Sequence, residues 1–156
     1  MTFAQSLTAA ARLTEATLDR ILSERSISGE APEPQAGRLI AAMRHAVLGG
    51  GKRVRPLLVI ESAALFGLPP QDAAHTAAAL ELVHCYSLAH DDLPAMDNDE
   101  LRRGQPTVWK AYDEWTAILA GDGLLTLAFE VLGRAETHSD PAVRVALISA
   151  LARASG

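Results

Sequence analysis

The sequence predicts an all-α protein, and three observations support this prediction. Long segments are rich in Ala and Leu, and apolar residues recur in them at the spacing of one helix face. Gly and Pro gather between these segments, where helices begin or end. Aromatic residues make up only 4% of the chain, and the alternation of apolar and polar residues that indicates strands is scarce.

The sequence of the N-terminal third of the chain predicts two helices. An amphipathic helix comes first, because its apolar side chains share one face; they are Leu7, Ala10, Ala11, Leu18, Ile21 and Leu22. A polar linker that contains Gly and Pro should follow at Ser26 to Pro34. The second helix is expected from about Gln35 to Leu48, where consecutive glycines stop it.

Pro and Gly also delimit the helices in the rest of the chain. The predicted helices run from Pro56 to about Phe66, from Asp72 to Asp92, from Thr107 to Ala120 and from Asp122 to Leu132. Gly121 should mark the join between the last two. A final helix should begin with Asp140 as N-cap and Pro141 at its first position, and run to the end of the chain.

Length and composition exclude several classes of protein. A chain of 156 residues can bury one core, so we expect a single all-α domain over residues 1–156. A net charge of -5 argues against a nucleic-acid partner. Cys85 is the only cysteine, which excludes an internal disulfide and fits a reducing cytoplasm. Neither an uninterrupted apolar run long enough for a membrane span nor a signal peptide is visible, so no stable membrane insertion is expected.

The most informative stretch runs from Asp91 to Gly104, where five acidic side chains stand beside two adjacent arginines. Carboxylates this close repel one another unless a cation neutralises them, and Mg²⁺ prefers one or two carboxylates together with phosphate oxygens and water. Arg102 and Arg103 present forks of donors that match phosphate. The stretch therefore indicates a metal site next to an anion site, with a solvated acidic loop as the alternative.

The helix that leads into this stretch carries polar groups on one face. The residues at i, i+3, i+4 and i+7 are His84, Ser87, Leu88 and Asp91. A lone histidine on such a helix is often a core residue, so this pattern alone leaves the role of His84 open. Pro94 should end or bend the helix and leave Asp97 free to point back at Asp91.

A basic cluster follows the glycines. Lys52, Arg53 and Arg55 come between Gly49–Gly51 and Pro56, at the expected start of a helix. Backbone N–H groups, the helix dipole and side-chain charge would converge there on an anion. The spacing is not that of a Walker A loop. The cluster alone could be a basic surface turn, but basic groups on both sides of an acidic site favour a binding site.

These blocks resemble the trans-polyprenyl diphosphate synthase family, and most closely its short-chain bacterial farnesyl diphosphate synthases. The resemblance rests on Gly50-Gly51-Lys52-Arg53-Val54-Arg55-Pro56, on His84 to Asp97, on Leu101 to Thr107 and on Ala120-Gly121-Asp122, in the family's order and spacing. It is strong from about Leu39 onward. It implies the helical bundle of type I isoprenoid synthases, here truncated, in a cytoplasmic homodimer.

The resemblance also implies the reaction and its residues. A Mg²⁺-dependent prenyltransferase would condense isopentenyl diphosphate with dimethylallyl or geranyl diphosphate to give farnesyl diphosphate, through ionisation, condensation and elimination. The expected catalytic residues are Asp91, Asp92, Asp97 and Arg102. The three aspartates would hold Mg²⁺ against the allylic diphosphate, with Asp91 and Asp97 as the expected direct ligands, and Arg102 would contact the same diphosphate. The residues expected to bind the diphosphate of isopentenyl diphosphate are Lys52, Arg55, His84 and Arg103.

Two further features concern the product and its cavity. Tyr86, five residues before Asp91, corresponds to an aromatic stop for the growing chain in short-chain enzymes, which implies a C15 product. On a helical wheel Ser87 lies nearer the face of Asp91, so both positions are candidates for setting chain length. The alternative for Tyr86 is an ordinary buried aromatic residue. Leu88 and Leu93 would suit the dry apolar cavity that an allylic cation needs.

The chain also departs from the family. A complete synthase carries a second aspartate-rich motif with a Lys-Thr pair and a Gln, and this sequence contains no second Asp-Asp-x-x-Asp. We therefore expect the N-terminal half of an enzyme, with little or no activity alone. One alternative is a non-catalytic helical subunit or inactive fragment. Another is a metal phosphohydrolase built on His45, His90 and Asp91, which would leave both basic clusters without roles.

Overall fold

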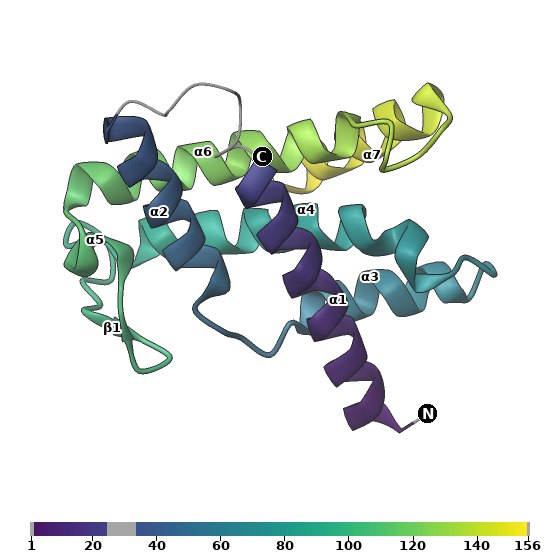
Figure 1. The fold of residues 1–156 in the computed structure, drawn as a ribbon, viewed down its shortest axis with the longest axis horizontal. Helices are drawn as coiled ribbons and strands as arrows, with labels where there is room; N and C mark the ends of the chain where they lie inside the picture. Colours follow the sequence, from purple (N-terminus) through teal and green to yellow (C-terminus); the bar gives the residue numbers. More distant parts are fainter. Residues whose placement is uncertain (1, 25–33, 156) are drawn as a thin grey trace. The chain divides into compact units, whose positions relative to one another are not determined.

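The computed structural model describes residues 2–24 and 34–155 and confirms the all-α prediction (Figure 1). Seven helices and one short hairpin follow one another in these ranges. In chain order they are α1 (Phe3–Glu24), α2 (Pro34–Leu48), α3 (Val54–Ala64), α4 (Pro70–Asp91), β1 (Leu101–Arg102), β2 (Gln105–Pro106), α5 (Val108–Ala111), α6 (Glu114–Gly133) and α7 (Pro141–Ser155).

The predicted helices in the first two thirds of the chain are confirmed to within a few residues. Most of the expected linker from Ser26 to Pro34 lies outside the described residues. The start of α7 is also confirmed, because the carboxylate of Asp140 accepts the N–H of Ala142 at 2.8 Å and so caps the first turn.

The predicted helix join at Gly121 is wrong. The chain breaks earlier, at Tyr112, whose φ of -119° and ψ of -89° end α5. A new helix, α6, then begins after Asp113, whose carboxylate caps it by accepting the N–H of Thr116 at 2.7 Å. Gly121 lies inside α6, where a Cβ would be 2.2 Å from Nε2 of His90. This glycine therefore permits a close approach between side chain and helix and does not end a helix.

The hairpin was not predicted. β1 and β2 pair in antiparallel fashion, with Leu101 opposite Pro106 and Arg102 opposite Gln105. The two residues between the strands, Arg103 and Gly104, have φ values of 53° and 78°. Positive φ at both central positions is typical of a type I′ hairpin turn. Strands of two residues are too short to show a periodic pattern in the sequence.

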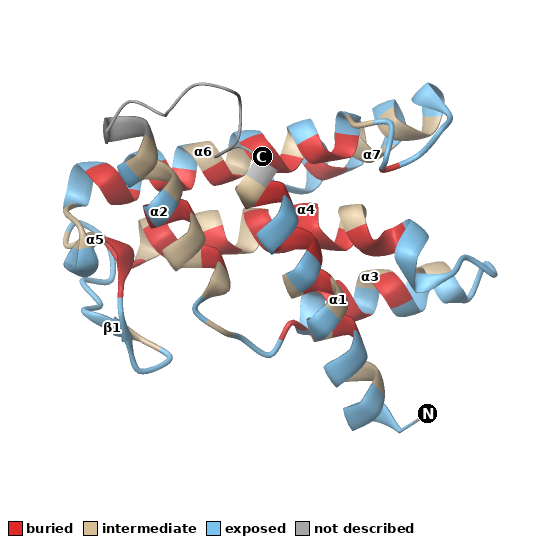
Figure 2. Ribbon diagram, in the orientation of Figure 1, coloured by how far each residue is buried: buried red, intermediate tan, exposed pale blue. Residues whose placement is uncertain are grey.

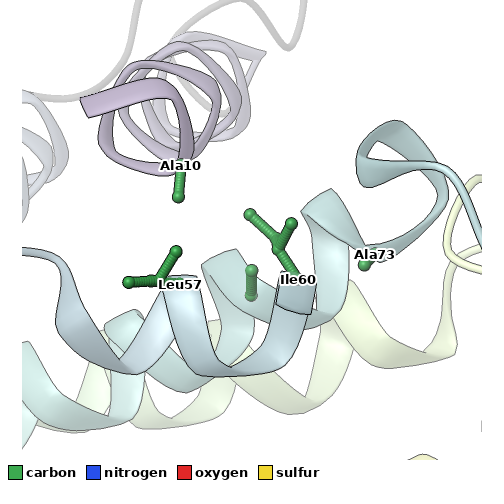
Figure 3. Packing of buried hydrophobic residues seen from close by; sticks show 5 residues of the cluster. Ala10, Leu57, Ile60 and Ala73 are labelled. Atoms are coloured by element: carbon green, nitrogen blue, oxygen red, sulfur yellow. The ribbon is translucent and has the colours of Figure 1, made fainter. Parts of the chain in front are cut away.

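The chain divides into two compact units. The first comprises Met1–Thr17, Lys52–Glu81 and Thr126–Gly156, and the second Leu18–Gly51 and Leu82–Leu125. In the first unit, α3 packs against parts of α1 and α4 (Figure 3) through Ala10, Leu57, Ile60, Ala73 and Ala77. The prediction of a single domain over residues 1–156 stays a prediction.

The second unit contains the acidic stretch and its hairpin. Buried apolar side chains from α2, α4 and α6 stabilise it (Figure 2); they include Ala42, Met43, Val47, Leu82, Cys85, Ala89, Ala117, Ala120 and Leu124. Among the described residues, α6 is long and apolar enough to cross a membrane by length and composition alone. Half of its apolar window is buried in the protein, as in a core helix, so the expectation of no membrane insertion stays a prediction.

Candidate functional site

The candidate site begins at the C-terminal end of α4, where the chain turns back on itself. The N–H of Asp97 donates to the carbonyl of Asp91 at 2.8 Å, and the N–H of Asn98 donates to the carbonyl of Leu93 at 3.0 Å. Asn98 has a φ of 54°, a left-handed conformation that Asn adopts more readily than most residues. The bend expected at Pro94 is therefore confirmed, and the backbones of Asp91 and Asp97 are hydrogen-bonded neighbours.

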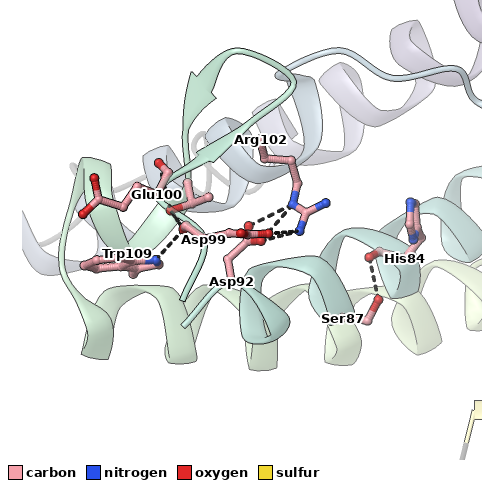
Figure 4. Close-up of polar contacts among 8 residues, drawn as sticks. His84, Ser87, Asp92, Asp99, Glu100, Arg102 and Trp109 are labelled. Carbon is pink, nitrogen blue, oxygen red and sulfur yellow. Dashed lines mark hydrogen bonds and ion pairs between the residues drawn. The ribbon is translucent and has the colours of Figure 1, made fainter. Parts of the chain in front are cut away.

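Asp92 and Arg102 form a closely bonded pair (Figure 4). The buried carboxylate accepts Nε at 2.9 and 3.1 Å and Nη2 at 2.5 Å. These hydrogen bonds raise the pKa of Arg102 above its ordinary value; burial opposes the rise, and the charges of Asp92, Asp99 and Asp91 add to it. The guanidinium therefore stays charged. Its Nη1 has no hydrogen bond to any residue in the described ranges.

Asp91 and Asp97 differ from Asp92, because their carboxylates make no hydrogen bond or ion pair with any described residue. Asp97 is exposed and Asp91 is half-buried. Within residues 2–24 and 34–155, no group of three or more His, Cys, Asp and Glu side chains is arranged as a cation site. Two free carboxylates on one turn nevertheless suit Mg²⁺, which takes one or two carboxylates with phosphate oxygens and water. Asp91 and Asp97 could hold such an ion together with a phosphorylated ligand.

Two side chains without a predicted role fix the base of the hairpin. The carbonyl of Asp99 accepts the Thr107 hydroxyl at 2.8 Å and Nε1 of Trp109 at 2.8 Å (Figure 4). The N–H of Thr107 donates to the carbonyl of Glu100 at 3.0 Å. The loop that carries Arg102 is therefore closed at its ends. Sequence reasoning missed Thr107 and Trp109 because their shared partner, the carbonyl of Asp99, is brought to them by the hairpin, which was not predicted.

Arg103 contacts the glycine turn that precedes Lys52 in the chain. Its Nη1 donates to the carbonyl of Gly50. A Cβ on Gly51 would lie 2.5 Å from the same nitrogen, and Gly50 and Gly51 have positive φ values of 87° and 150°. The glycines therefore do more than stop a helix. Their positive φ values are ones that residues with side chains rarely adopt, and Gly51 leaves room for the guanidinium of Arg103.

Lys52, Arg53 and Arg55, the three cations of the turn that follows the glycines (the basic turn), have different environments. Lys52 and Arg55 are exposed and make no hydrogen bond or ion pair with described residues. Arg53 is buried and pairs with Glu81 and Glu15. The expectation that three cations converge on an anion is therefore wrong for Arg53. A charged residue such as Glu81 within an apolar helix was the available signal for a buried partner.

The face of α4 that carries His84, Ser87, Leu88 and Asp91 is half-buried. His84 is half-buried, and Figure 4 shows its ring on the side of α4 where Arg102 lies. Ser87 directs its hydroxyl to the carbonyl of His84 at 2.9 Å, so this group is bonded to its own helix. Tyr86 packs edge-on against His90, with ring centroids 5.1 Å apart. The roles of Tyr86 and Ser87 in chain length stay predictions.

The histidines needed for a phosphohydrolase have other partners. Nε2 of His45 lies 2.7 Å from the carbonyl of Pro106, and Nε2 of His90 lies 3.0 Å from the carbonyl of Ile118. A ring nitrogen that donates to a carbonyl cannot bind a metal, but the other nitrogen of the same ring keeps its lone pair. What disfavours this alternative is that the described residues contain no group of three or more His, Cys, Asp and Glu side chains arranged to hold a metal ion.

The cavity beside Asp92 and Arg102 has a volume of about 40 Å³ and is lined in part by Cys85 and Leu88. Ligand pockets are usually ~300 Å³ or larger. This cavity can hold water but is too small for a prenyl chain. The expected apolar cavity for the product is therefore not formed by these lining residues alone.

Comparison with known proteins gives consistent matches. A family model described as polyprenyl synthetase matches residues 37–155. The farnesyl diphosphate synthase of Geobacillus stearothermophilus is 48% identical over 120 residues, which cover 76% of this chain and 40% of that protein. Geranylgeranyl pyrophosphate synthase 4 of Arabidopsis thaliana is 49% identical over 115 residues, which cover 74% of this chain and 30% of that protein.

A solved structure also matches. The apo crystal structure of an FPP/GFPP synthase from Zymomonas mobilis superposes with a TM-score of 0.86 and 48% identity, covering 99% of this chain and 54% of that one. The chain thus spans about half the length, or less, of these relatives.

Proposed function

Because this chain belongs to the polyprenyl synthetase family, we propose that it supplies diphosphate- and Mg²⁺-binding residues of a prenyltransferase. The substrates would be isopentenyl diphosphate and an allylic diphosphate, dimethylallyl or geranyl. The observation that carries the proposal is that the three aspartates differ in whether their carboxylates are already paired. Asp92 holds Arg102, while the carboxylates of Asp91 and Asp97 on the same turn have no hydrogen-bond or ion-pair partner in the part of the chain that the structure describes.

In this proposal the allylic diphosphate binds at the turn that carries Asp91, Asp92 and Asp97, here called the acidic turn. Mg²⁺ bound there would neutralise negative charge on the leaving diphosphate and so favour ionisation of the allylic C–O bond. Asp91 and Asp97 would hold the ion. Arg102 would donate from Nη1 to the diphosphate, since Asp92 already occupies its Nε and Nη2 and keeps the guanidinium oriented before substrate arrives. Asp92 then positions Arg102 and need not ligate the metal.

The diphosphate of isopentenyl diphosphate is proposed to bind Lys52, Arg55, His84 and Arg103. The exposure of Lys52 and Arg55, and their lack of partners among described residues, support this role. The double bond of this substrate would attack the allylic cation, and a proton would then be lost to the released diphosphate.

The proposed product is farnesyl diphosphate. Tyr86 supports it, because its ring is held against His90 and adds bulk five residues before Asp91. Ser87 offers less, since its small side chain is bonded back to α4. The relatives include both farnesyl and geranylgeranyl synthases at similar identity, so product length needs a direct assay.

A cytoplasmic homodimer is also proposed. Trp115, Ile118 and Leu119 fall at i, i+3 and i+4 on α6 and are exposed, which gives an apolar stripe suited to a protein partner. The same stripe would serve the alternative function of a non-catalytic helical subunit. We propose little or no turnover by the 156-residue chain alone, because the sequence has one aspartate-rich motif.

Isothermal titration with inorganic pyrophosphate, with and without Mg²⁺, tests the binding proposal directly. We expect Mg²⁺-dependent heat that Asp91→Asn and Asp97→Asn abolish. A parallel assay with isopentenyl and geranyl diphosphates should give no more than traces of a C15 product from this chain. Binding indifferent to Mg²⁺ and to both substitutions would contradict the enzyme proposal and favour the subunit.

A further inference from the structure

Arg53 stands between Lys52 and Arg55 in the chain, but its surroundings are those of a core residue. Its side chain is 0% exposed. Nη1 donates to Glu81 at 2.6 Å, and Glu81 is itself only 3% exposed. Nε donates to Glu15 at 3.2 Å, and Glu15 is 44% exposed. All three residues belong to the first compact unit.

This arrangement needs arginine in particular. Burying a guanidinium and a carboxylate removes both from water, which is unfavourable unless each is well bonded. The planar fork of Arg can donate to two carboxylates from different nitrogens, whereas the ammonium of Lys acts as a point charge. Arg53 therefore connects the basic turn to α1 through Glu15 and to α4 through Glu81.

The backbone at Arg53 shows that the turn is constrained. Arg53 precedes α3 as its N-cap residue, with a φ of 51° and a ψ of 37°, and its side chain makes no capping hydrogen bond. A non-glycine residue in the left-handed region persists when its surroundings hold it there. Here the buried ion pair holds the side chain, so the residues on either side project outward. Lys52 and Arg55 are both exposed.

We propose that Arg53 is a positioning residue, and that its buried ion pair with Glu81 fixes the turn that presents Lys52 and Arg55 to a substrate diphosphate. Neither Arg53 nor Glu81 touches substrate in this arrangement. The inference rests on the proposed function, because that function assigns Lys52 and Arg55 to diphosphate binding.

The test measures isopentenyl diphosphate binding to the full 156-residue chain by calorimetry in EDTA, where the acidic turn has no cation. Glu81→Gln should weaken this binding by about tenfold or more, since small misplacements of binding groups are costly. Glu15→Gln is the matched control: it neutralises the exposed partner of the same guanidinium and should change binding by less than about twofold, as an exposed ion pair is weak. Mg²⁺-dependent pyrophosphate binding, assigned to Asp91 and Asp97, should remain in every variant.

The outcomes separate the two proposals. If the unmodified chain binds neither ligand, the proposed function fails. If it binds both, and folded Glu81→Gln binds isopentenyl diphosphate as tightly as the unmodified chain, the inference about Arg53 is overturned. A general loss of structure would weaken the binding of both isopentenyl diphosphate and pyrophosphate. It therefore cannot produce the expected selective loss of isopentenyl diphosphate binding.

If circular dichroism shows that Glu81→Gln is unfolded, the same binding test is made with Arg53→Lys and Arg53→Gly. Arg53→Lys keeps the charge, and Arg53→Gly removes the side chain but suits the positive φ. Selective weakening in a folded variant supports the inference, and unchanged binding in that variant overturns it.

Discussion

Asp92 and Arg102 share an ion pair but are buried to different extents, with side chains that are 4% and 31% exposed. Removing one partner therefore has a different consequence from removing the other. Without Arg102, a buried carboxylate is left without its main donor. Without the Asp92 charge, the guanidinium can still reach water.

The first prediction follows from this asymmetry. Arg102→Ala should lower the free energy of unfolding by ~3 kcal/mol, because it leaves the buried charge of Asp92 uncompensated. Asp92→Asn should cost only about 1 kcal/mol, because the amide oxygen can still accept a hydrogen bond. Urea unfolding monitored by circular dichroism gives both values. Equal losses, or a larger loss for Asp92→Asn, would show that the asymmetry in burial does not control stability.

The second prediction concerns the free carboxylates. Asp91→Asn and Asp97→Asn should leave the melting temperature nearly unchanged without ligand, because neither carboxylate has a partner among described residues. With Mg²⁺ and pyrophosphate, the unmodified chain should gain stability, by about 2.7 kcal/mol at a hundred times Kd, and the variants should gain much less.

Asp99→Asn is the control for this experiment, because Asp99 is an acidic neighbour whose carboxylate lies 3.5 Å from Arg102. It should retain the stabilisation by Mg²⁺ and pyrophosphate. If Asp99→Asn lost it as fully as Asp97→Asn, the effect would reflect general negative charge and not specific ligands.

The sequence predicted the positions of most helices and the acidic turn because both depend on local patterns. Pro94 is an example: its ring cannot continue a helix, so a bend after Asp91 follows from one residue. The hydrogen bond from Asp97 to Asp91 agrees with this expectation.

Contacts between distant segments could not be predicted in the same way. Lys52, Arg53 and Arg55 are equivalent as charges in the sequence, and only the fold brings Glu81 to Arg53 and leaves the other two exposed. Gly121 was misinterpreted for a related reason. Glycine often ends helices, but here its missing side chain makes room for His90 from another helix.

The third prediction tests this interpretation of Gly121. Gly121→Ala should destabilise the protein by ~2 kcal/mol, because the added methyl would overlap His90. In a His90→Ala background the same substitution should stabilise α6 by up to ~1 kcal/mol, since alanine favours helix. A double-mutant cycle from urea unfolding measures the coupling directly.

Gly37→Ala serves as the control, because a Cβ at Gly37 in α2 meets nothing within 4 Å. It should be neutral or stabilising. If Gly121→Ala were equally harmless beside the native His90, the close packing of these two residues would not limit the sequence at this position.

The last prediction concerns pH and the start of α6. Desolvation acts to raise the pKa of Asp113, but hydrogen bonds from Thr116 and Arg38, with the charge of Arg38, outweigh it and lower the pKa. A carboxyl group with a lowered folded-state pKa stabilises the protein above its unfolded pKa of ~3.9, and that stabilisation is lost as pH falls through the folded value.

Asp113→Asn should therefore lower the urea midpoint at pH 7, and the difference from the unmodified protein should shrink as pH falls from about 4 through the lowered folded-state pKa of Asp113. The cap itself should survive, because Asn is also a good N-cap. Asp113→Ala removes the cap as well and should stay less stable at every pH. A difference between Asp113→Asn and the unmodified chain that did not change from pH 7 to pH 3 would show that the charge of Asp113 contributes nothing to the stability of this helix start.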